Sequence, residues 1–104
     1  MNYAEPKDLI GNIDPKSLIL QDIHFNNRKL ELTEATYHKA TLNNDYESLH
    51  WANNDRTLRW GIGQGLKTAL RYLLAQEAEA SGRQVSADMS EFDEVIEELV
   101  NGNL

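Results

Sequence analysis

The sequence predicts a mainly α-helical domain of the α+β class, with three to four helices and an N-terminal β-hairpin. Three observations support this class. Apolar residues recur at helical spacing through most of the chain after residue 33, two short runs before it alternate like strands, and Asn, Gly and Pro residues separate the segments. With 104 residues, 40% of them hydrophobic and 26% charged, the chain is expected to fold as a single domain, 1–104, around one modest core.

The N-terminal region favours a β-hairpin over residues 18–33. Two extended runs lie on either side of Asn26-Asn27, a pair that tolerates the left-handed backbone of a tight turn. Asp14-Pro15 competes with this assignment, because an aspartate N-cap followed by proline at the first helical position begins helices. A short helix at that point would delay the start of the first strand.

The segment after Thr33 favours helix. Thr33 can act as its N-cap, and Leu42 and Leu49 fall within one helical face. Asn43-Asn44 interrupts the pattern, because asparagine bonds its own backbone and favours turns. One bent helix and two short helices therefore fit this segment equally well.

The longest helix is predicted over residues 56–80. Asn54 or Asp55 can cap it, and Ser81-Gly82 ends it. The apolar stripe of this helix comprises Leu58, Ile62, Leu66, Ala69, Leu70 and Leu73. A last helix is predicted after Ser90, with an apolar stripe that ends at Gly102.

The stretch WGIGQGLKTALRYLL, residues 60–74, places three glycines at alternate positions within the predicted long helix. A phosphate-binding loop requires a lysine directly after its last glycine, but Leu66 stands between Gly65 and Lys67, so no nucleotide or other cofactor is predicted. Gly61, Gly65 and Ala69 are spaced by four residues, which lines them up on one side of a helix and predicts close packing against another backbone. The alternative is a loop, with the helix beginning only at Leu66.

The net charge of −7 is unevenly distributed along the chain. Residues 56–76 carry four bases and no acid, whereas residues 77–104 carry eight acids and one base. The bases flank Trp60 on a helical wheel, and the acids concentrate on the last helix. The predicted interaction residues are Trp60, Arg56, Arg59, Lys67 and Arg71 on the first of these surfaces, and Glu91, Asp93, Glu94, Glu97 and Glu98 on the second.

These surfaces predict a small acidic, non-enzymatic protein that binds or regulates another protein. The basic flank and the acidic helix also suit each other, either within one chain or across a homodimer. A dense carboxylate face can in addition imitate the phosphates of a nucleic acid. The alternative function is a nucleic-acid-binding regulator that uses the basic flank of helix 56–80, although a negative net charge repels phosphates at long range.

Catalytic and metal sites are not predicted. The chain has no cysteine, and its histidines, His24, His38 and His50, have no zinc-ligand spacing. Serine, histidine and aspartate occur without the local signature of a nucleophile, so no catalytic residue is assigned. No run of about 18 apolar residues occurs and the first residues do not resemble a leader, so we expect a cytoplasmic protein without membrane contact.

Overall fold

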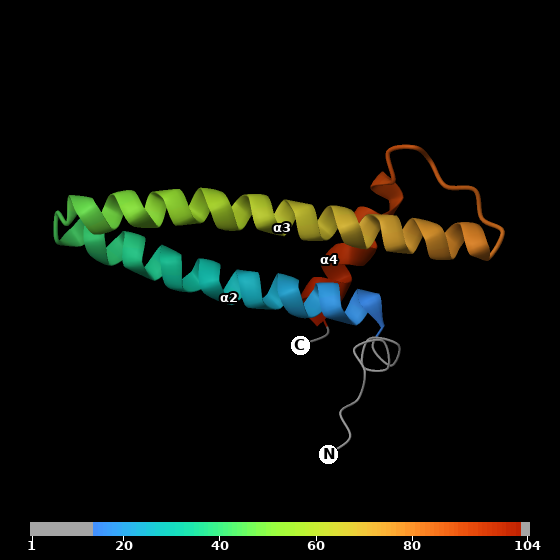
Figure 1. Cartoon of the computed structure of the whole chain (residues 1–104), viewed down its shortest axis with the longest axis horizontal. Coiled ribbons are helices and arrows are strands. Elements are labelled where there is room, and N and C mark those ends of the chain that lie inside the picture. Colours follow the sequence, from blue (N-terminus) through green and yellow to red (C-terminus); the bar gives the residue numbers. More distant parts are fainter. Residues whose placement is uncertain (1–13, 103–104) are drawn as a thin grey trace, which may run out of the picture.

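The computed structural model describes residues 14–102 and shows a long helical hairpin with a short helix across its open end (Figure 1). The elements are α2 (Pro15–Leu42), α3 (Tyr46–Ala80), a 3-10 turn η1 (Ser90–Phe92) and α4 (Asp93–Gly102). The predicted mainly helical class is confirmed, and residues 14–102 contain no strand. Residues 1–13, on which the expectation about a leader rests, lie outside the described part.

The predicted β-hairpin over 18–33 is wrong, because these residues form the first half of α2. The helix-initiating pair Asp14-Pro15 determines the structure here. Asp14 caps the helix by accepting a hydrogen bond from the Lys16 backbone N–H at 3.1 Å, and Pro15 occupies the first helical position. The buried side chains of α2 follow helical spacing, but Asn26 and Thr33 occupy two of these positions. Because these two residues are polar, only short apolar runs are left in the sequence of α2, and such runs resemble strands.

Asn43-Asn44 is the only asparagine pair of the described residues that forms a turn. Asn44 adopts a left-handed backbone with φ 53°, and Asp45 caps α3 by accepting from the Ser48 N–H at 3.2 Å. The structure therefore separates the segment after Thr33 into two helices. The long helix begins at Tyr46 rather than near residue 56, and it ends at Ala80 as predicted.

The last helix is reached through a different cap from the predicted one. Met89 has a left-handed backbone with φ 54°, and the Asp88 carboxylate accepts from the Ser90 N–H at 3.1 Å. Ser90 opens η1, which leads into α4 and its predicted end at Gly102.

Within residues 14–102, the apolar core lies only at the open end of the hairpin, where α4 crosses α2 and α3 (Figure 1). Its largest buried side chains are Ile23, Leu70, Phe92 and Ile96. We call residues 26–42 and 46–63 the outer half of the hairpin. The buried residues of the outer half are Asn26, Thr33, Ala40 and Ala52, so it holds no large buried apolar side chain.

Two glycines of α3 provide a test of this packing. A Cβ at Gly61 would meet nothing within 4 Å, whereas one at Gly63 would lie 3.3 Å from the Asn26 side-chain amide nitrogen. We expect Gly61→Ala to raise the free energy of unfolding by about 0.8–1.0 kcal/mol, the usual helix gain of alanine over glycine. Gly63→Ala should gain less, because the Asn26 amide must shift. Urea unfolding of both variants measures the difference, and equal gains would contradict the close contact.

Acid should weaken the cap of α3. Hydrogen bonds from the Ser48 hydroxyl and backbone N–H lower the pKa of Asp45 from its ordinary 3.8. The stabilisation from a lowered carboxyl pKa is present above about pH 4 and is lost as the pH falls through the folded pKa. Asp45→Asn keeps a good cap without titrating. Denaturant unfolding at neutral and acid pH should therefore show a smaller acid loss for Asp45→Asn than for the natural chain.

Candidate protein-interaction site

A seam of polar side chains joins α2 to α3 in the outer half. The Asn26 side-chain amide donates to the Arg59 carbonyl oxygen at 2.9 Å, and the Thr33 hydroxyl donates to the Asp55 carboxylate. Both Asn26 and Thr33 are buried. Polar groups paired at such positions fix the register of two helices, since a slipped register would leave them buried without partners.

The polar seam leaves the large apolar side chains of the outer half facing outward. These exposed residues are Leu32, Leu42, Tyr46, Trp51, Leu58, Trp60 and Ile62. Single exposed apolar side chains are ordinary, but a polar interior beneath an apolar exterior is not. Compared with a helical pair that is stable by itself, the outer half is inverted, because polar side chains lie inside and apolar side chains lie outside.

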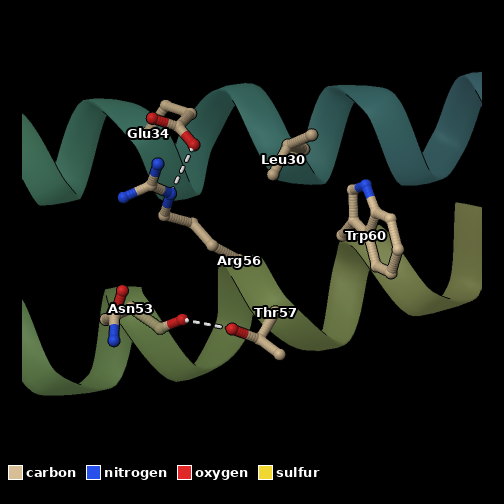
Figure 2. Close-up of a pocket in the computed structure, with 6 residues that line it drawn as sticks. All are labelled: Leu30, Glu34, Asn53, Arg56, Thr57 and Trp60. Carbon is tan, nitrogen blue, oxygen red and sulfur yellow. Dashed lines mark hydrogen bonds and ion pairs between the residues drawn. The ribbon is translucent and has the colours of Figure 1, made fainter.

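An open hollow of about 380 Å³ lies between α2 and α3 on one side of the outer half (Figure 2). Its lining residues are Leu30, Glu34, Asn53, Arg56, Thr57 and Trp60. Trp60 is 66% exposed and lies beside Leu30 at one end of the hollow. The Arg56 side chain crosses from α3 toward Glu34 on α2 (Figure 2).

Arg56 is held in a defined position. Its Nε lies 2.7 Å from Glu34 Oε1, and its guanidinium carbon lies 4.6 Å from the centre of the Tyr37 ring. The pairing leaves less conformational freedom to lose on binding than a free arginine would have. Next to Arg56, Thr57 donates to the Asn53 carbonyl oxygen at 3.2 Å. The hollow thus offers an indole and a leucine as apolar contacts, bordered by oriented polar groups.

The basic flank of α3 is neutralised within the chain. Lys67 Nζ lies 3.3 Å from Glu97 Oε1, and Arg71 Nε lies 2.6 Å from Asp93 Oδ1, both on α4. Arg59 Nε lies 3.6 Å from an oxygen of Asp55 in its own helix. With the Arg56 pair, every predicted basic residue faces a carboxylate, so a phosphate would have to displace an existing partner.

The acidic surface of the last helix is divided by these contacts. Besides the two carboxylates that face α3, Glu91 pairs with Arg83 at 2.8 Å. Glu94 and Glu98 are exposed and make no ion pair within residues 14–102. Of the dense carboxylate face predicted from the sequence, these two residues are the ones that make no ion pair within residues 14–102.

The glycine stretch is helix rather than loop, because α3 runs unbroken from Tyr46 to Ala80. Its backbone amides are consequently committed to the helix, and no helix begins at Leu66. Apart from the adjacent residues and the backbone of their own helix turns, no heavy atom of residues 14–102 would lie within 4 Å of a Cβ at Gly61 or Gly65, so no other described element packs against them. Packing of Gly61, Gly65 and Ala69 against another molecule stays a prediction.

The histidines lie apart from one another along the hairpin. His38 meets the Tyr37 ring edge-on with centroids 6.2 Å apart, and His50 Nε2 lies 3.3 Å from the Asn54 amide. Residues 14–102 contain no group of three or more His, Cys, Asp or Glu residues arranged to hold a metal ion. Over the same range, no helix has the length and apolar character needed to span a membrane.

Comparisons with protein-family models, curated proteins and solved structures find no match to this chain. Trp60 and the bases were predicted from the sequence as interaction residues, whereas the polar seam beneath them was not predicted. The sequence pattern that indicates the seam is the spacing of Asn26 and Thr33, which are seven residues apart and lie on the same helical face as Ile23.

The attachment of α4 can be separated into apolar and ionic parts. Phe92 is 5% exposed within the core, whereas Arg71 and Asp93 form a partly exposed ion pair. Phe92→Ala should lower the free energy of unfolding by about 3–5 kcal/mol through lost burial and a cavity. Arg71→Ala should cost less than about 1 kcal/mol, because water screens an exposed pair. Chemical unfolding of both variants checks the order, and a larger loss for Arg71→Ala would contradict it.

Proposed function

We propose that this chain is a non-enzymatic protein-interaction module that binds or regulates another protein through the hollow around Trp60 and Arg56. The observation that carries the proposal is the inversion of the outer half. Asn26 and Thr33 are buried there, while large apolar side chains face outward. A partner that covers Trp60 and Leu30 in the hollow would remove apolar surface from water, which is the main driving force for protein association.

The residue types in the hollow support its role as the binding surface. Tryptophan and arginine are the side chains most enriched among residues that dominate binding energy at protein interfaces. Trp60 supplies exposed apolar area, and the Glu34 carboxylate holds Arg56 in place. The best-suited partner would insert an apolar side chain against Trp60 and Leu30 and bring polar groups to Arg56 and Glu34.

The nucleic-acid alternative has less support than protein binding. Its proposed contacts include Lys67 and Arg71, and α4 already supplies a carboxylate to each. A phosphate backbone would have to replace these partners and approach a chain with a net charge of −7. The outward carboxylates Glu94 and Glu98 are too few to imitate a phosphate array by themselves.

Two tryptophans of the same helix provide a matched test. Trp60 and Trp51 are 66% and 55% exposed, but Trp51 does not line the hollow. Proteins captured from native extract by the immobilised chain are identified by mass spectrometry, and the affinity of each is then measured with purified partner. Trp60→Ala should weaken binding by about 30-fold or more, the usual effect of losing an anchor residue. Trp51→Ala should leave the affinity nearly unchanged.

Equal binding by Trp60→Ala and the natural chain would contradict the proposal. Salt-sensitive binding to single-stranded or duplex nucleic acid, lost on charge reversal at Arg59 and Arg71, would favour the alternative function instead. Circular dichroism of each variant shows whether the helices are retained. Both tryptophans are exposed, so we expect both substitutions to preserve the fold.

A further inference from the structure

The side of the hairpin opposite the hollow carries a second apolar surface. Leu58 and Ile62 each lie two residues from Trp60, and helical positions two apart point in directions about 200° apart. On α2, Leu32 likewise lies two residues from both Leu30 and Glu34, which line the hollow. We call this surface the back face. Its large apolar residues are Phe25, Leu32, Trp51, Leu58 and Ile62, all classed as exposed.

The back face repeats every seven residues on both helices. On α2 the repeat comprises Leu18, Phe25, Leu32 and Lys39, and on α3 it comprises Trp51, Leu58, Gly65 and Tyr72. A seven-residue spacing keeps these positions on one side of each helix over several turns, as at one of the two core positions of a coiled coil. The α3 repeat extends for about 30 Å at 1.5 Å per residue.

The polar seam aligns the two repeats. Thr33 lies opposite Asp55, and Asn26 lies opposite Gly63. Leu32 therefore lies within two residues of the level of Leu58 across the hairpin. By the same register Phe25 lies within two residues of the level of Gly65, so this face carries a large side chain on α2 near the level of an open glycine on α3.

The exposed apolar area of the back face is comparable to the apolar area that one partner contributes to a standard protein interface. Phe25, Trp51, Leu32, Leu58 and Ile62 are 52%, 55%, 65%, 57% and 38% exposed. With roughly 200 Å² for a whole aromatic side chain and roughly 100 Å² for an aliphatic one, they expose on the order of 400 Å² of apolar surface. A standard interface buries about 800 Å² per partner, somewhat more than half of it apolar.

We infer that a second copy of this chain covers the back face, so that two hairpins form a four-helix bundle. A two-fold axis parallel to the helices places α2 of one copy against α3 of the other, in antiparallel orientation. Phe25 of each copy then lies near Gly65 of its partner, where a Cβ would meet nothing within 4 Å in the single chain. The two small-against-large contacts are equivalent by symmetry.

Charge supports the same arrangement. Lys39 continues the α2 repeat beyond Leu32, and Glu47 precedes Trp51 by one turn of α3. Both are exposed and neither makes an ion pair within residues 14–102. By the register of the seam, the two-fold axis brings Lys39 of each copy within about one helical turn of Glu47 of the other, a distance that two long side chains can span at the edge of the interface. A partner with different helices would have to supply this acid and the matching seven-residue repeat independently.

The inference concerns a different surface from the hollow and stands without the proposed function. In the bundle the hollow lies on the outside of each hairpin. It therefore remains open to another protein. Loss of self-association and loss of partner binding are consequently separate results.

Sedimentation and light scattering over a wide concentration range test the inference. The natural chain should approach twice its monomer mass of 11.9 kDa as its concentration rises. Leu58→Glu should raise the dissociation constant of the dimer by at least about tenfold, because it places a carboxylate in an apolar contact. Leu58 is exposed in the single chain, so the variant should keep its helices by circular dichroism. Thr57→Glu, one residue away on the hollow side, is the matched control and should not change the mass.

A charge exchange tests the arrangement of the two copies. Lys39→Glu and Glu47→Lys should each weaken the dimer by up to about fivefold, and the double variant should restore it. A natural chain that remains monomeric at every concentration would overturn the inference. So would a dimer that resists Leu58→Glu but is lost with Trp60→Ala, since it would use the hollow, and so would a double charge variant no stronger than the single ones.

Discussion

The hydrogen bond from the Asn26 amide to the Arg59 carbonyl oxygen fixes how α2 and α3 lie against each other. Together with the bond from Thr33 to Asp55, it places polar groups where a self-sufficient pair of helices would bury leucine or isoleucine. The register so fixed brings Glu34 beside Arg56 and forms the hollow at Trp60. The same register aligns the apolar residues of the back face. Both proposed surfaces thus depend on one short set of buried bonds.

The open end of the hairpin contains the apolar core, whereas the outer half carries the exposed apolar side chains. At the open end, Phe92 and Ile96 of α4 complete a core with Ile23 and Leu70, and the ion pairs lie at its edge. Apolar burial of this kind contributes several times more per residue than exposed ion pairs do. The outer half lacks such a core and presents its apolar side chains to solvent. One end of the molecule therefore provides stability, and the other provides surface.

Local signals in the sequence predicted some helix ends but not others, because the expected caps Thr33 and Asn54 or Asp55 lie inside α2 and α3. Asp14-Pro15, Ser81 and Gly102 mark observed boundaries, because caps depend on a few adjacent residues. The β-hairpin was mispredicted because Asn26 and Thr33 conceal the apolar stripe of α2. Their burial depends on partners in α3, which no local pattern specifies.

The candidate site was predictable only in part. The basic flank around Trp60 followed from helical spacing, and the acidic last helix was its expected partner, which the pairs of Lys67 with Glu97 and Arg71 with Asp93 bear out. The pairing of Arg56 with Glu34 was not foreseen. It requires the chain to reverse at Asn43-Asn44, and the sequence left open whether a turn forms there. The hollow therefore became visible only with the fold.

The position of the core at one end has a consequence for the motions of the free chain. Local opening costs least where few large apolar side chains are buried, so backbone amides near Asn44 should exchange their hydrogens with solvent sooner than those near Leu70. Separation of α2 from α3 that starts at the turn would be gradual, because the hydrogen bonds of the polar seam must break one after another. A partner that clamps the outer half would slow this exchange at the turn, far from the only apolar core in residues 14–102.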